Sequence, residues 1–148
     1  MGYIITKANI NQRRCSRVRK TLGLQFRAAP AELGERVLEH FGKRLKEWME
    51  RRGVGLVDIA QNLRISYSYA AFLGKAKPYG RLLSPENAAA LAEFLNISPD
   101  EVFSAMGQIN PYLAEKVPIE VLEAELIELH KRLRERVREE SELDERSR

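Results

Sequence analysis

Two short apolar repeats separated by a polar turn constrain this chain more than any other feature. The first repeat has Ile59, Ala60 and Leu63 as its expected inward residues. The second spans about 67–74 and follows Ser66, a residue type that caps the N-termini of helices. Two short helices joined by such a turn make a helix-turn-helix, which needs a small residue such as Ala60 where its helices cross. The residues expected to lock the crossing angle are Ile59, Leu63, Ile65 and Leu73.

Further helices are predicted on both sides of this motif. Ser84-Pro85 and Ser98-Pro99 each combine an N-cap serine with a proline at the first helical position. Before the motif, apolar residues recur at spacings of three and four, which predicts one long helix or two joined near Gly42. No strand pattern of any length occurs outside the first 31 residues, so the predicted fold class is all-α, with a five-helix domain. The buried stripe of the first helix is expected to be Leu33, Val37, Phe41, Leu45, Trp48 and Met49.

The positive charge of the chain is concentrated at its N-terminus. The chain has 148 residues and a net charge of +4, but residues 1–31 hold seven basic and no acidic residues. We expect a basic arm over 1–31, a helix-turn-helix domain over 32–109 and a C-terminal helix over 110–148. Such an arm can follow phosphates and release counterions, although a surface segment without a partner has the same composition. The arm residues expected to contact nucleic acid are Arg13, Arg14, Arg17, Arg19 and Lys20.

A long amphipathic helix is predicted to begin at Pro118, and the tail after Arg136 is highly charged. Its apolar residues are spaced 3, 4, 3 and 4, which is a heptad seam that ends at Arg136. The seam either forms a homodimer or packs back on the same chain, and we favour the dimer because it would present two copies of the motif to a two-fold site. The residues expected at this dimer interface are Ile119, Leu122, Leu126, Leu129 and Leu133.

Several short segments within about residues 40–103 carry a resemblance to a known family. They include Asp58-Ile59-Ala60, Ile65-Ser66, Ser84-Pro85-Glu86 and Ile97-Ser98-Pro99-Asp100-Glu101. With these segments the chain resembles the lambda-repressor and Cro type of helix-turn-helix transcriptional regulators. The resemblance implies a five-helix domain whose third helix reads DNA in the major groove.

The resemblance also implies which residues would meet DNA, and the chain departs from the family at some of them. The family usually has Ser and Gln where this chain has Gly55 and Leu56, often Gly where it has Arg64, and Glu where it has Gly74. The reading face holds no Arg, Asn or Gln, which leaves apolar contact with thymine methyl groups but no bidentate base reading. The recognition-helix candidates are Tyr67, Ser68, Tyr69, Ala71 and Phe72, and the phosphate candidates are Arg64, Ser66, Lys75, Lys77 and Arg81. The aromatic candidates could equally be ordinary partly buried residues, and the basic ones a solvated loop.

The remaining chemistry of the sequence does not point to an enzyme. His40 and His130 are the only histidines, and neither lies in a metal-ligand spacing. The single cysteine, Cys15, favours a reducing compartment; among its arginine neighbours a redox-sensing role is an alternative. No apolar run is long enough for a membrane span. We therefore expect a cytoplasmic, nucleoid-associated protein without cofactor.

Two hypotheses follow for the function. The first is a homodimeric, sequence-specific regulator that binds double-stranded DNA with its third helix and its arm. The second is a protein-interaction module, such as an antitoxin or a transcription or nucleoprotein adaptor, whose Tyr-Phe surface meets a protein partner.

Overall fold

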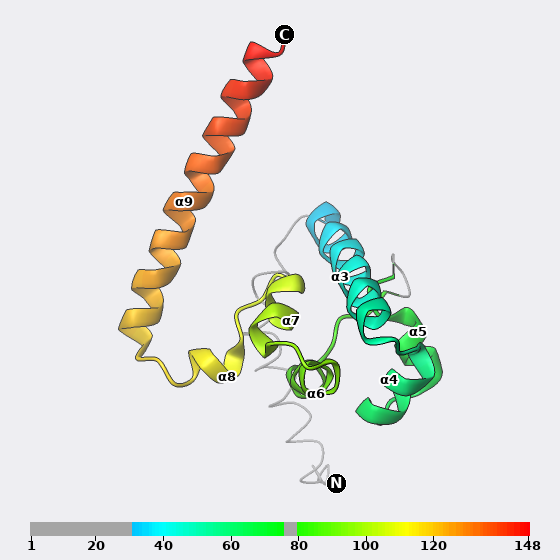
Figure 1. The fold of residues 1–148 in the computed structure, drawn as a ribbon. Helices are drawn as coiled ribbons and strands as arrows, with labels where there is room; N and C mark the ends of the chain where they lie inside the picture. The colour runs from blue at the N-terminus through cyan, green and yellow to red at the C-terminus, as the bar shows by residue number, and fades with distance from the viewer. Residues whose placement is uncertain (1–30, 76–79) are drawn as a thin grey trace, which may run out of the picture. The chain divides into compact units, whose positions relative to one another are not determined.

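The computed structural model describes residues 31–75 and 80–148, and these residues are helical without any β-strand (Figure 1). The predicted all-α class is therefore confirmed for this part of the chain. Backbone contacts divide the chain into an N-terminal unit, up to Gln108, and a C-terminal unit, from Ile109. The N-terminal unit contains α3 (Ala31–Arg52), α4 (Leu56–Leu63), α5 (Tyr67–Phe72), α6 (Pro85–Leu95) and α7 (Pro99–Ala105), and the C-terminal unit contains α8 (Pro111–Ala114) and α9 (Ile119–Arg146).

The first long helix, α3, is continuous through Gly42. Its predicted stripe is confirmed at Phe41, Leu45 and Trp48, which are buried, but is wrong at Leu33, which is exposed. Leu33 is exposed because a groove of about 420 Å³ separates the first turns of α3 from the end of α7. Leu38, which the spacing pattern left out, is buried in its place.

Local capping signals account for the starts of the later helices. Ser84 Oγ accepts a hydrogen bond from the N–H of Asn87 at 3.3 Å, and Ser98 Oγ accepts one from the N–H of Asp100 at 3.2 Å. Each cap satisfies a backbone donor that would otherwise lack an intrahelical partner. The expected C-terminal segment 110–148 begins with a separate short helix, α8, whose first turn is capped by Asn110 Oδ1.

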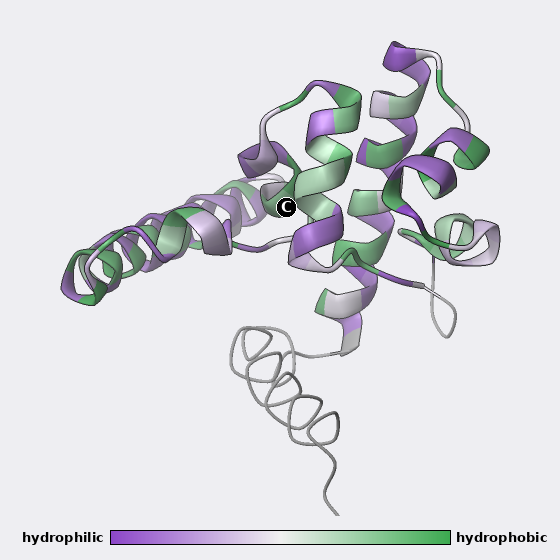
Figure 2. Cartoon of the chain, turned by 90° about the horizontal axis from the view of Figure 1, so that it is seen from below, coloured by the Kyte–Doolittle hydropathy of each residue, from purple (hydrophilic) through white to green (hydrophobic). Residues whose placement is uncertain are grey.

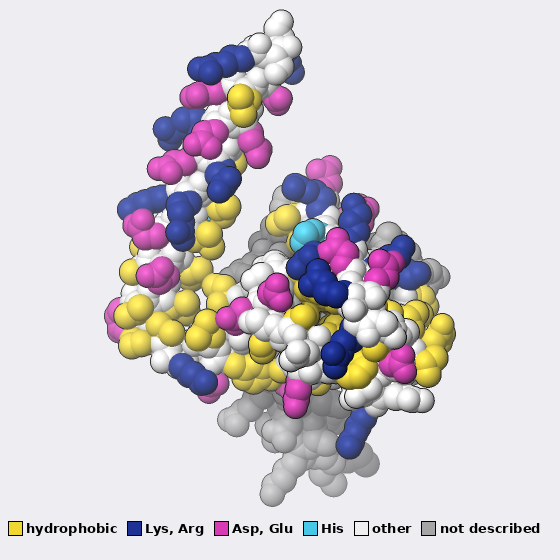
Figure 3. Space-filling view, viewed as in Figure 1, with side chains coloured by type: hydrophobic (Ala, Val, Ile, Leu, Met, Phe, Trp, Pro, Cys, Tyr) yellow, Lys and Arg dark blue, Asp and Glu magenta, His cyan; other side chains and the backbone are white. Residues whose placement is uncertain are grey.

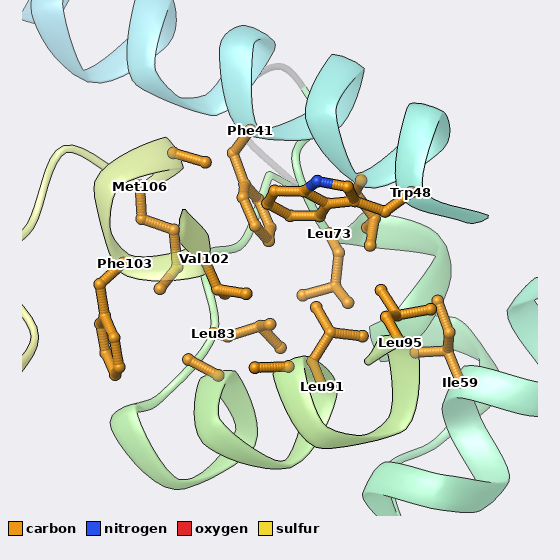
Figure 4. Packing of buried hydrophobic residues seen from close by; sticks show 14 of the residues in the cluster. Phe41, Trp48, Ile59, Leu73, Leu83, Leu91, Leu95, Val102, Phe103 and Met106 are labelled. Atoms are coloured by element: carbon orange, nitrogen blue, oxygen red, sulfur yellow. The ribbon is translucent and has the colours of Figure 1, made fainter. Parts of the chain in front are cut away.

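One hydrophobic core holds the N-terminal unit together (Figure 4). α4 packs against both α5 and α6, and α6 packs against α7, while α3 contacts α6 and α7. Full burial of a large apolar side chain stabilises a fold by about 1.5 to 3 kcal/mol. The largest fully buried side chains are Trp48, Phe41, Phe103, Ile59, Leu91, Met106 and Val102.

The backbones of α3 and of the segment after α5 touch at two glycines. A Cβ atom built on Gly42 would lie only 2.4 Å from the carbonyl oxygen of Gly74, and one built on Gly74 would lie 2.4 Å from the Cα of Gly42. Gly74 also has a φ of 65°, which residues with a Cβ rarely adopt. Both positions therefore need glycine, and this contact fixes where α5 ends relative to α3.

The C-terminal unit is dominated by α9, which continues beyond the last residue of the predicted seam to Arg146. Hydrophobic and hydrophilic residues alternate along this helix (Figure 2). Ile119, Leu129 and Leu133 are exposed, and Leu122 and Leu126 are half-buried. Val137, one turn after Leu133, is exposed and lies beside the next seam position, which Arg136 occupies. Within the described residues, no helix combines the length and the apolar character that a membrane crossing requires.

Candidate functional site

A three-residue turn joins α4 to α5 and fixes the angle between them. Arg64 adopts a left-handed conformation with a φ of 54°, and the N–H of Ile65 donates to the carbonyl oxygen of Ala60 at 3.0 Å. The Ile65 side chain packs against the core. Ser66 then starts α5, because its Oγ accepts a hydrogen bond from the N–H of Tyr69 at 3.1 Å. The predicted N-cap role of Ser66 is confirmed.

The six residues of α5 divide into an inner and an outer face. Ala70 is 1% exposed and holds the helix against the core. On the other side, Tyr67 is 57% and Phe72 is 38% exposed. Ser68 is exposed and Ala71 half-buried, so four of the five recognition-helix candidates form one accessible face. We call Tyr67, Ser68, Ala71 and Phe72 the outer face of α5.

Tyr69, the fifth candidate, lies apart from this face. Its side chain is half-buried, and its hydroxyl donates a hydrogen bond to the carbonyl oxygen of Leu82 at 3.3 Å. This bond links α5 to the segment that precedes α6. Tyr69 thus positions α5 in the described structure, whereas the outer face is available for contact.

The base of the loop after α5 is closed by two backbone hydrogen bonds. The N–H of Gly74 donates to the carbonyl oxygen of Arg81 at 2.8 Å, and the N–H of Arg81 donates to that of Phe72 at 2.9 Å. Lys75 and Arg81, both exposed, are therefore held beside the C-terminal end of α5. Arg81 also donates from Nη1 to the carbonyl oxygen of Gly80 at 3.0 Å. The other predicted cations lie outside the described residues, and they are Lys77 in the loop and Arg13, Arg14, Arg17, Arg19 and Lys20 in the arm. Cys15 of the arm lies outside the described residues as well.

The start of α4 is capped without a serine or threonine side chain. Gly55 has no side chain to cap the helix, but its N–H donates to Oδ2 of Asp58 at 2.8 Å. The carboxylate of Asp58 in the first turn also interacts favourably with the positive end of the helix dipole. Leu56, the first residue of α4, is half-buried and lines an apolar groove.

This groove, of about 480 Å³, runs between α3 and α5 and was not predicted from the sequence. Its apolar wall includes Met49, Leu56 and Ala71. Its charged lining residues are Glu39, Lys43 and Lys46 of α3 together with Lys75. On the part of the surface seen in Figure 3, basic and acidic side chains alternate over the N-terminal unit. Helical spacing alone places Gly42, Lys43 and Lys46 on one face of α3. These residues lie near Lys75 only because Gly42 contacts Gly74, and the sequence pattern does not show that contact.

Other chemistry is sparse in the described residues. His40 and His130 are both exposed, and Nδ1 of His130 lies 2.7 Å from the carbonyl oxygen of Leu126 in its own helix. No three His, Cys, Asp or Glu side chains in this part of the chain lie close enough together to hold a metal ion. Comparisons with protein-family models, with curated protein sequences and with solved structures find no match to this chain.

Proposed function

We propose that the protein is a sequence-specific transcriptional regulator of the lambda-repressor and Cro type, which inserts α5 into the major groove of double-stranded DNA. The observation that carries the proposal is the outer face of α5: its inner side is held by the core, while Tyr67 and Ser68 stand exposed at its N-terminal end. A helix presented in this way behind a tight turn has the arrangement in which helix-turn-helix proteins contact base edges.

The chemistry of the outer face sets the kind of reading it can perform. The hydroxyl groups of Tyr67 and Ser68 can exchange single hydrogen bonds with base edges, and Ala71 and Phe72 can contact thymine methyl groups. A helix of six residues is only about 9 Å long, so it spans few base pairs. Most of the affinity would therefore come from phosphate contacts, which the arm and the cations around α5 supply.

Arg64 is the described cation that best fits a phosphate contact. It is exposed in a left-handed turn position that glycine would occupy with less strain. A residue that keeps a side chain at such a position is a candidate for a functional role. Ser66, Lys75 and Arg81 would add contacts at the two ends of α5.

Replacing Arg64 with glycine should therefore move stability and DNA affinity in opposite directions. We expect Arg64→Gly to raise the free energy of unfolding by up to about 1 kcal/mol, because the left-handed strain is relieved. DNA affinity should fall about fivefold at physiological salt, since one phosphate contact is lost. Urea unfolding and fluorescence anisotropy measure the two effects. Asn96→Gly, at the same φ of 54° after α6, is the matched control and should leave DNA affinity unchanged; a loss of affinity in both variants would contradict the role of Arg64.

The α9 helix would make the regulator a dimer. Its seam leaves Ile119, Leu129 and Leu133 exposed, and a second copy would cover them. A dimer presents two copies of α5 and so doubles the number of base pairs read, which matches the two-fold symmetry of many operators.

Selection of bound fragments from random DNA tests the proposed function. We expect the full-length protein to enrich one sequence of two related half-sites, and to prefer it over bulk DNA by a factor of at least about 10³. Recovery of unrelated fragments, together with equal binding to all of them, would contradict sequence-specific regulation.

The apolar groove between α3 and α5 favours a second candidate, a protein-interaction module such as an antitoxin or a transcription adaptor. An apolar groove lined by three lysines and one glutamate suits an amphipathic acidic helix better than it suits DNA. In this form of the hypothesis the partner meets the groove, and not the Tyr-Phe surface expected from the sequence. Replacing the exposed residues Lys43 and Lys46 with glutamate would then weaken binding of an acidic helical peptide, measured by fluorescence anisotropy, whereas Tyr67→Ala would not.

A further inference from the structure

The charges of α9 are arranged in three blocks along the helix. Residues 120–128 carry four glutamates and no Lys or Arg, residues 131–138 carry five basic residues and one acidic residue, and residues 139–145 carry five acidic and no basic residues. Hydrophobic side chains gather along the first half of α9, and charged side chains of both signs cover its second half (Figure 3). The apolar seam therefore spans an acidic block and the basic block that follows it.

A parallel pair of α9 helices would oppose like charges throughout. In such a pair each residue faces its own copy, so the acidic blocks meet each other and the basic blocks do the same. The seam would also continue from Leu133 into Arg136 and Glu140, and each of these would meet an identical charge in the centre of the pair. Like charges facing each other across helices are destabilising, and unpaired charges at seam positions add the cost of desolvation.

An antiparallel pair removes the like-charge contacts in one register, and the charged seam residue Arg136 then lies opposite Ile119 at each end of the pair. With the two-fold axis between Leu126 and Leu129, Leu126 of one copy faces Leu129 of the other, and Leu122 faces Leu133. This register makes four layers of leucines. It also brings the acidic block of each copy against the basic block of the other.

A pair of charges beside the seam fits the same register. Glu125 and Arg132 flank the seam on one side of α9, and neither forms an ion pair within the described residues. In the antiparallel register, Glu125 of each copy lies opposite Arg132 of the other, so two equivalent pairs form across the dimer. We infer that α9 binds a second copy of this chain as an antiparallel helix pair centred between Leu126 and Leu129.

The orientation of the pair determines the distance between the starts of the two α9 helices, where the rest of each chain joins the dimer. In this register Ile119 of one copy lies opposite Arg136 of the other, so the starts of the two helices are about 26 Å apart. In a parallel pair they would be about 10 Å apart. This inference rests on the dimer of the proposed function and deepens it, since the wider separation suits half-sites about one turn of DNA apart, about 34 Å.

Distances between spin labels in the full-length dimer test the orientation. The labels are attached to a single cysteine, introduced by Glu120→Cys or by Ser141→Cys in a Cys15→Ser background. Both sites are exposed, and they share one side of the helix because three seven-residue repeats separate them. The antiparallel register predicts separations between the two copies of about 23 Å at residue 120 and about 40 Å at residue 141. A parallel pair predicts two equal short distances near the helix separation of about 10 Å plus the label lengths.

The control variant carries Leu126→Glu and Leu129→Glu together. It should sediment as a monomer and lose both dipolar signals, while the far-UV circular dichroism and thermal unfolding of the N-terminal unit stay unchanged. Equal short distances, a monomeric parent protein, or a dimer that survives the double substitution would each overturn the inference. Because the labels are read without DNA, a parallel dimer that still selects a DNA sequence would refute this inference and leave the proposed function standing.

Discussion

Substitution of Gly42 by valine is expected to lower the free energy of unfolding of the N-terminal unit by about 2 to 4 kcal/mol. The new Cβ would lie 2.4 Å from the carbonyl oxygen of Gly74, which is closer than packed atoms can approach. The obstacle is backbone, so a side-chain rotation cannot relieve it. Valine gains some helix propensity over glycine, but by much less than the clash costs.

Urea unfolding followed by circular dichroism measures this effect. Gly55→Ala is the matched control, because a Cβ there would meet only Oδ2 of Asp58, at an ordinary 3.8 Å. Its expected cost is below about 1 kcal/mol, the scale of a changed N-cap residue. If Gly42→Val proves no more harmful than Gly55→Ala, α3 and the end of α5 do not approach each other in the way described.

Neutralising the basic arm is expected to reduce DNA affinity by a factor on the order of 10² to 10³ at physiological salt. The change replaces Arg13, Arg14, Arg17, Arg19 and Lys20 with glutamine. Each lost phosphate contact removes about 0.9 from the slope of log affinity against log salt, so the loss of all five contacts should make the slope shallower by up to about 4.5. Fluorescence anisotropy titrations at several salt concentrations measure both quantities.

A charge-preserving variant provides the control for the arm. Replacing the four arginines with lysine keeps the positive charges and should retain most of the salt dependence, because counterion release follows charge rather than side-chain shape. The preference for a selected fragment over bulk DNA should survive in both variants, since phosphates carry no sequence information. An unchanged salt slope in the glutamine variant would remove the arm from the DNA interface.

Features set by neighbouring residues were predicted well from the sequence. The caps at Ser66, Ser84 and Ser98 match the structure, because each depends on a few adjacent residues. α8 was missed because its four residues carry too short a pattern to tell from a loop. Leu33 was misplaced because spacing along a helix identifies a face but not how far its partner helix extends.

The candidate site was predicted only in part, because several of its contacts join residues that are far apart in the sequence. The outer face of α5 follows from helical periodicity, but the bond from Tyr69 to Leu82 joins residues thirteen apart. The approach of Gly42 to Gly74 joins two segments whose association no local pattern encodes. The groove that these contacts create, with Lys43, Lys46 and Lys75 along it, therefore emerged only from the three-dimensional structure.

The central claim is that the outer face of α5 reads DNA sequence. Its most direct measurement is the ratio of affinities for a selected fragment and for bulk DNA, compared between the parent protein and Tyr67→Ala. Tyr112→Ala is the matched control, because Tyr112 is a similarly exposed tyrosine in the C-terminal unit. We predict that the ratio falls about tenfold or more in Tyr67→Ala, the scale of one lost base contact, and stays constant in Tyr112→Ala. A ratio that is the same in all three proteins would contradict the claim.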